Sequence, residues 1–77
     1  MMLKVLPNDA AAVMNCSPQY IRIGLQQGKL DIGSAVKMSS IWTYNISPAL
    51  LAKRQGMTVQ ELEELIIKLR GEENGKQ

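Results

Sequence analysis

The spacing of apolar and polar positions, together with the turn residues between them, divides the chain into four short helices and one hairpin. A first helix is predicted over residues 9–14, with Asn8 as its N-cap. A second is predicted over residues 18–27, because Ser17 is a hydroxyl N-cap and Gly28 suits the left-handed residue that ends a helix. Two short helices separated by three residues are typical of a helix-turn-helix.

The middle of the chain favours strands. β-branched and aromatic residues alternate around Ser39-Ser40, which predicts a hairpin with residues 35–38 paired to residues 41–46. Ser39-Ser40 lacks the Asn-Gly or Asp-Gly chemistry of the preferred two-residue turns, so the register stays open.

Two further helices are predicted after the hairpin. Ser47-Pro48 repeats the Ser-Pro start and Gly56 ends the third helix, while Thr58 and Glu61 form a capping box for a last helix that ends near Arg70. Residues 71–77 are polar and are expected to form a flexible tail. The fold class is therefore mainly α with a small β-hairpin, in the order helix-helix-hairpin-helix-helix.

The second helix has one apolar face and one polar face. At about 100° per residue, Ile21 and Leu25 share the face expected to pack on the first helix through Ala11 and Met14. The rest of the helix and its cap supply the candidate DNA contacts, Ser17, Gln19, Tyr20, Arg22, Ile23 and Gln26. Glutamine pairs with adenine and arginine with guanine in the major groove, whereas the alternative is an ordinary solvated helix face.

The hairpin has two interpretations that are compatible with each other. Its tip offers side chains that can meet phosphates or a minor groove, namely Lys37, Met38, Ser39 and Ser40. Its alternating residues are expected to cover the core in part, namely Val36, Trp42, Tyr44 and Ile46.

The last helix carries an aliphatic stripe at 3-4-3 spacing, formed by Val59, Leu62, Ile66 and Leu69. Two interpretations stay open for this stripe. It either packs on its own domain or binds a protein partner, which would be an integrase or a second copy of the chain. The acidic start of the helix disfavours contact with phosphates.

Composition narrows the function classes. A chain of 77 residues with no His and one Cys has too few ligands for a tetrahedral zinc site and cannot form an internal disulfide. We expect no cofactor, no small-molecule substrate and no membrane partner, and a cytoplasmic location. The carboxylates show no pairing typical of acid–base catalysis, so no catalytic residue and no enzyme activity are predicted. The net charge of +2 permits a polyanionic partner without requiring one.

The assembled motifs resemble excisionase-type and MerR-type winged helix-turn-helix proteins of phages and integrative elements, over residues 6–56. The residues that carry the resemblance are Ala10-Ala11, Cys16-Ser17-Pro18, Ile21-Arg22, Gly28-Lys29-Leu30, Trp42-Thr43-Tyr44 and Ile46-Ser47-Pro48, with the runs 21–28 and 35–40 around them. The sequence departs from the family pattern in a wing that offers chiefly Lys37 instead of several arginines, and in Asn15 at the turn glycine.

The resemblance implies a winged helix-turn-helix domain over residues 1–56, followed by a packing or partner helix over residues 57–70. It implies that the second helix enters the major groove of double-stranded DNA and that the hairpin is the wing. The implied function is that of a recombination directionality factor of a mobile element, which binds DNA architecturally and assists an integrase. A transcription regulator with the same fold is the alternative, and a protein-interaction module is the alternative of another class.

Overall fold

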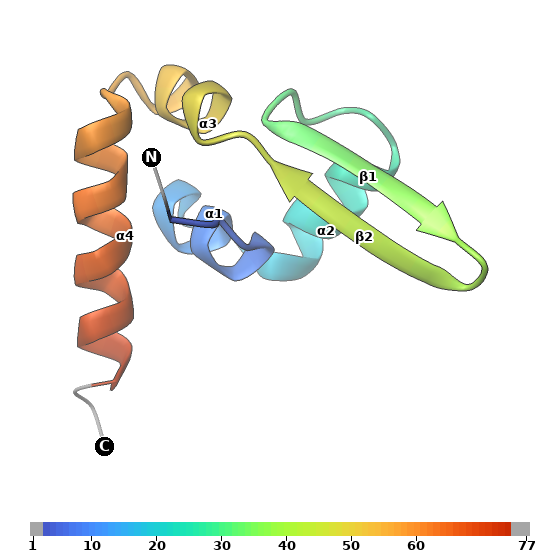
Figure 1. Ribbon diagram of the computed structural model, residues 1–77, viewed down its shortest axis with the longest axis horizontal. Helices are drawn as coiled ribbons and strands as arrows, with labels where there is room; N and C mark the ends of the chain where they lie inside the picture. Colours follow the sequence, from blue (N-terminus) through green and yellow to red (C-terminus); the bar gives the residue numbers. More distant parts are fainter. Residues whose placement is uncertain (1–2, 75–77) are drawn as a thin grey trace.

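The computed structural model describes residues 3–74, which form four helices and one antiparallel hairpin (Figure 1). In chain order the elements are α1 (Pro7–Met14), α2 (Pro18–Gln26), β1 (Gly33–Met38), β2 (Ile41–Ile46), α3 (Pro48–Gln55) and α4 (Val59–Asn74). The predicted order helix-helix-hairpin-helix-helix is confirmed, and so is the mainly helical class.

The chemistry of the helix ends explains where most of the helices begin. The hydroxyl oxygens of Ser17 and Ser47 accept the N–H groups of Tyr20 and Leu50 at 3.1 and 3.2 Å. Each of these serines is followed by a proline at the first helical position, where no hydrogen bond is lost.

α1 begins two residues earlier than predicted. Its N-cap is Leu6 and not Asn8, because Pro7 occupies the first helical position with a backbone angle suited to it. The Leu6 N–H donates to the Asp9 carboxylate at 2.9 Å, which satisfies one of the free donors at this helix end. Asn15 ends the helix in the left-handed conformation, with φ of 58°.

α4 is longer than predicted. It continues to Asn74, so residues 71–74 are helical instead of belonging to the tail. Gly71 therefore lies inside the helix and does not end it. Residues 75–77 of the predicted tail lie outside the described residues.

The hairpin register runs from Gly33 opposite Ile46 to Met38 opposite Ile41, with Ser39-Ser40 as the two-residue turn. β1 therefore starts two residues before the predicted strand. Because side chains alternate between the two faces of a strand, Trp42, Tyr44 and the buried Ile46 share an inner face.

The prediction that Val36 helps to cover the core is wrong. Val36 pairs with Thr43 on the outer face of the hairpin, and it is 53% exposed. The neighbours of Val36 on β1, Ala35 and Lys37, are the residues that share the inner face with Tyr44 and Trp42.

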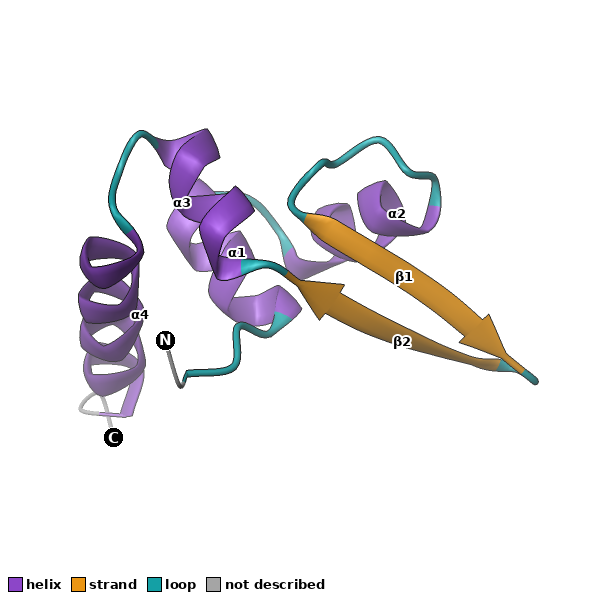
Figure 2. Ribbon diagram, turned by 45° about the horizontal axis from the view of Figure 1, so that its top comes forward, coloured by secondary structure: helices purple, strands orange, loops and turns teal. Residues whose placement is uncertain are grey.

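The hydrophobic core lies where α1, α2, α3, α4 and the base of the hairpin meet (Figure 2). Its most deeply buried large side chains come from α2, the segment before β1, α3 and α4, and they are Ile21, Ile32, Leu51, Leu62 and Ile66. Leu30 and Ile32 lie in the irregular segment between α2 and β1, yet both are buried. Between residues 3 and 74 no helix has both the length and the apolar character required to cross a bilayer.

Candidate nucleic-acid interface

α2 packs against the body through the face that the sequence predicted. Ile21 and Leu25 are buried beside Ala10 and Ala11 of α1. The opposite side of α2 is consequently turned to solvent, and this orientation makes it available to a ligand.

The loop after α2 is held close to the helix at Gly24. The carbonyl oxygen of Gly24 accepts the N–H groups of Lys29 and Leu30 at 2.9 and 3.3 Å. A Cβ at position 24 would lie only 2.6 Å from Leu30 Cγ, so the absence of a side chain allows this close approach. The loop therefore carries Lys29 back alongside the exposed side of α2.

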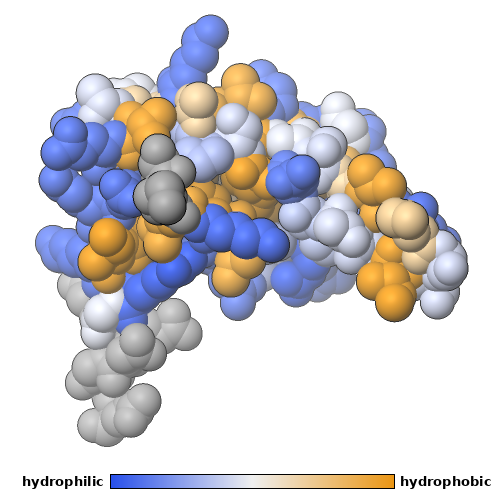
Figure 3. Space-filling view, in the orientation of Figure 1, coloured by the Kyte–Doolittle hydropathy of each residue, from blue (hydrophilic) through white to orange (hydrophobic). Residues whose placement is uncertain are grey.

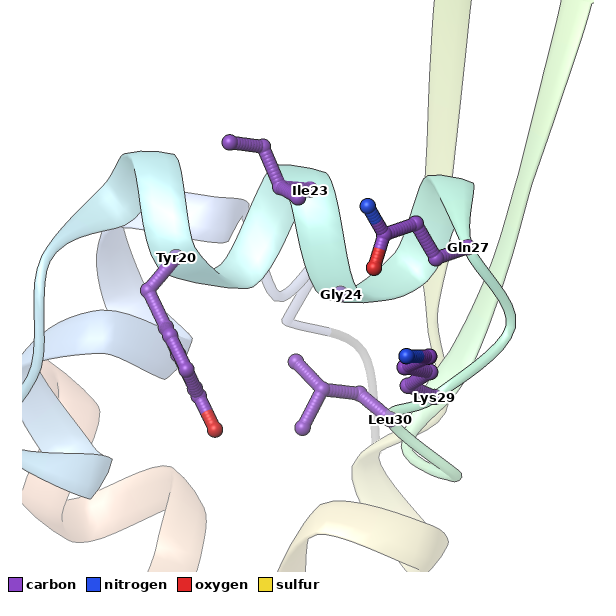
Figure 4. Close-up of a pocket in the computed structure, with 6 residues that line it drawn as sticks. All are labelled: Tyr20, Ile23, Gly24, Gln27, Lys29 and Leu30. Carbon is purple, nitrogen blue, oxygen red and sulfur yellow. The ribbon is translucent and has the colours of Figure 1, made fainter.

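A shallow cleft of about 190 Å³ lies between α2 and this loop (Figure 4). Its lining residues are Tyr20, Ile23, Gly24, Gln27, Lys29 and Leu30. Tyr20 and Leu30 extend toward the same space, whereas the end of the Ile23 side chain points away from it.

The candidate contacts on α2 are not equally accessible. Gln19, Tyr20 and Ile23 are exposed, as predicted for DNA contacts, and Gln27, which was not among the predicted contacts, is exposed as well. Ser17 is also exposed, but its hydroxyl oxygen serves the helix cap.

Arg22 and Gln26 are partly buried, and they lie one helical turn apart on the same flank of α2. The Gln26 amide donates a hydrogen bond from Nε2 to the Tyr44 hydroxyl at 2.6 Å. This bond joins the flank of α2 to the inner face of β2, so the Gln26 amide is oriented by the protein itself. Helical spacing alone could not have indicated this bond, because Tyr44 lies eighteen residues further along the chain.

The inner face of the hairpin continues from Tyr44 toward the tip through Trp42 and Lys37, which are paired across the two strands. Trp42 is partly buried and Lys37 is exposed. The far end of the hairpin projects beyond α2 in both ribbon views (Figures 1 and 2). The side of α2 and this inner face therefore adjoin and form one surface with a basic group near its end.

The four predicted wing residues are all exposed, but they do not share one face. Lys37 lies on the inner face, Ser39 and Ser40 form the turn, and Met38 lies on the outer face opposite Ile41. Met38 and Ile41 are 70% and 68% exposed and, with Val36, make an apolar patch at the hairpin end (Figure 3).

Charge is distributed unevenly along the chain. Residues 15–57 contain five basic side chains and one acidic one, whereas residues 58–77 contain five glutamates and three basic side chains. The basic group consists of Arg22, Lys29, Lys37, Lys53 and Arg54. The single acid, Asp31, pairs with Arg54 at 3.3 Å in an exposed position. The net charge of the chain is only +2, but the segment that contains α2 and the hairpin is basic.

The aliphatic stripe of α4 packs on its own domain. Leu62 and Ile66 are fully buried, and Val59 and Leu69 are partly buried, where α4 contacts α1 and α3. Side chains as buried as Leu62 and Ile66 cannot contact a partner without opening the core. Leu62 and Ile66 therefore pack inside the domain, and a partner surface on α4 would have to use other residues than these two.

An ion pair fastens α4 to α1. The Arg70 guanidinium donates to both carboxylate oxygens of Asp9, at 3.0 and 2.6 Å, and to the Lys4 carbonyl oxygen at 3.0 Å. Burial alone would raise the pKa of Asp9, but the hydrogen bonds from Arg70 and Leu6 and the Arg70 charge together lower it below its ordinary value. This bidentate pair removes Arg70 from the cations available to a ligand.

The described residues, 3–74, contain no cluster of three or more His, Cys, Asp or Glu side chains that could hold a metal ion. The lone thiol, Cys16, is partly buried against the core. Comparisons with protein-family models, with curated proteins and with solved structures gave no match to this chain.

Proposed function

We propose that this chain is a DNA-binding protein with a winged helix-turn-helix, in which α2 enters the major groove and the hairpin is the wing. One observation carries the proposal. The Gln26–Tyr44 hydrogen bond joins the partly buried flank of α2, next to its exposed side, to the inner face of the hairpin, within the segment that holds five basic side chains against one acid.

The dimensions and charges of this surface suit a duplex. The major groove is about 12 Å wide and admits one α-helix, and α2 offers amides and an aliphatic side chain on its exposed side. Phosphate contacts supply most of the affinity of such complexes, and Lys29 and Lys37 are exposed beside α2 and on the hairpin. The glutamate-rich α4 belongs on the side away from the DNA.

The resemblance to excisionase-type proteins favours a recombination directionality factor that binds DNA architecturally and assists an integrase. A transcription regulator would use the same surface, and the position of the gene beside an integrase gene distinguishes the two. The burial of Leu62 and Ile66 removes the observation that favoured a protein-interaction module acting through α4.

The experiment is a selection of bound sequences from random duplex DNA at moderate salt, followed by binding measurements over a range of salt concentrations. Lys37→Ala is expected to weaken all sequences alike and to reduce the slope of log K against log salt by about one unit, because one phosphate contact is lost. Lys68→Ala removes an exposed lysine of α4 and is the matched control, expected to leave the slope unchanged.

Failure to enrich any sequence would contradict the proposal. Equal effects of the two lysine substitutions would also contradict it, because the loss would then reflect net charge instead of a contact made by the hairpin.

A further inference from the structure

We infer that α2 selects A·T base pairs through a ridge of three exposed residues, Gln19, Ile23 and Gln27, with Ile23 packed against the 5-methyl group of a thymine. This inference rests on the proposed DNA-binding function and names the sequence class that α2 recognises. The three residues are called the α2 ridge below.

The α2 ridge consists of two exposed side chains on α2 and a third, Gln27, on the C-cap residue that ends the helix. Its members are four residues apart, so they follow one another along the helix at intervals of about 6 Å. All three are exposed, and Ile23 is 40% exposed despite its apolar side chain. Because base pairs are stacked about 3.4 Å apart, one interval of the ridge spans about two base pairs.

The chemistry of the α2 ridge matches A·T pairs. A glutamine amide can bond N6 and N7 of adenine together, and an aliphatic side chain packs against the thymine methyl group. A G·C pair has no methyl group in the same groove, and an isoleucine pressed against its acceptors and donor would remove their water without replacing its hydrogen bonds. The order amide, aliphatic, amide therefore favours an A·T-rich centre of the site.

Arg22 and Gln26, two other candidates for base recognition on α2, are less exposed than the ridge. Arg22, the residue suited to guanine, is partly buried. Gln26 lies on the same flank, and its amide donates to Tyr44. The ridge is thus the part of α2 that would reach furthest into the groove.

The test begins with the best duplex obtained by selection from random DNA. Each thymine is replaced in turn by deoxyuridine, which removes the 5-methyl group and keeps the base pair. We expect one replacement to weaken binding about fourfold, as the hydrophobic contribution of one buried CH₂-sized group, ~0.8 kcal/mol, implies.

The same scan with Ile23→Ala should lack that fourfold step, because the side chain that contacts the methyl group is gone. Ile67→Ala on α4, which is also an exposed isoleucine, is the matched control and should keep the step. The scan on the unchanged protein needs no variant, so a folding defect in Ile23→Ala would not prevent a decision.

A selected site with a G·C centre, or one indifferent to every deoxyuridine replacement, would overturn the inference and leave the DNA-binding function standing. If no duplex is enriched, the proposed function itself fails, and the inference fails with it.

Discussion

The two ends of this molecule use the same kinds of side chain in opposite ways. At the α1–α4 end, the large aliphatic residues of α4 that face inward, Leu62 and Ile66, are fully buried. At the hairpin end, Met38 and Ile41 are more than two-thirds exposed and contribute little to the core. We conclude that the side chains that stabilise the fold are concentrated at the helical end. The exposed residues of the hairpin end and of the outer side of α2 contribute little to folding, so they are available to contact a ligand.

The two aspartate–arginine pairs show the same contrast. The Asp9 side chain is 10% exposed and meets Arg70 through two hydrogen bonds, whereas the Asp31 side chain is 90% exposed and meets Arg54 through one at 3.3 Å. Solvent screens the second pair, and it has little geometric restraint. Only the first pair is expected to contribute measurably to folding.

The largest expected effect tests the difference between buried and exposed aliphatic side chains, and it compares two adjacent isoleucines on α4, Ile66 and Ile67. Ile66→Ala should lower the free energy of unfolding by about 2–5 kcal/mol, because it removes a buried side chain and leaves a cavity. That is a large part of the total stability expected for a domain of this size. Ile67→Ala, at a position 56% exposed, should change it by less than about 0.5 kcal/mol.

Urea unfolding followed by circular dichroism measures both values. Similar effects of the two substitutions would show that α4 does not pack through Ile66, and the interpretation of α4 as a packing helix would then fail.

The next largest effect is expected at the ion pair between α1 and α4. Asp9→Asn should lower the free energy of unfolding by about 1–2 kcal/mol at neutral pH, since charge-assisted hydrogen bonds are lost while Arg70, 38% exposed on its side chain, can still contact water. Asp31→Asn is the matched control in the exposed pair and should cost less than about 0.5 kcal/mol.

The Asp9 contribution also depends on pH in a defined direction. Because the pKa of Asp9 is lowered on folding, its stabilisation is complete above the ordinary value of 3.8 and is lost as the pH falls through the lower pKa of the folded state. The difference between the parent protein and Asp9→Asn should therefore shrink in strongly acidic solution. A difference that stays constant over this range would rule out the charge of Asp9 as its cause.

The parts of the fold that depend on local chemistry could be predicted from the sequence. The hydroxyl caps and the capping box, in which Thr58 and Glu61 exchange hydrogen bonds at 2.8 and 3.1 Å, were found where predicted. The burial of Leu30 and Ile32 was missed, because a short irregular segment has no periodicity to reveal which side chains face the core.

The sequence was sufficient to predict which helix carries the candidate site, but not which side chains on the flank of that helix are available to a ligand. Helical spacing identified the outward arc of α2, yet the position of the hairpin decides that Gln26 bonds to Tyr44 while Gln27 stays exposed. The error at Val36 has a similar origin. Neighbouring positions on a strand face opposite sides, so a register left open by the turn also leaves the inner face undetermined.

The smallest effect is expected at the hairpin tip, where Ser39 has a φ of 61°. A non-glycine residue in the left-handed region costs about 1 kcal/mol, and glycine is preferred at the first central position of a two-residue turn with a positive φ there. Ser39→Gly should therefore raise the free energy of unfolding, by less than about 1 kcal/mol because glycine also gains freedom in the unfolded chain.

Ser40→Gly is the control, because Ser40 does not have a positive φ, so this substitution relieves no backbone strain. Hydrogen exchange locates the effect. Slower exchange at the paired residues Met38 and Ile41 in Ser39→Gly, with unchanged exchange in α4, would show that the hairpin tip opens independently of the helical end. Equal slowing in α4 would mean that the hairpin and the helices unfold as one unit, and the separation of a stable end from a ligand-facing end would then be wrong.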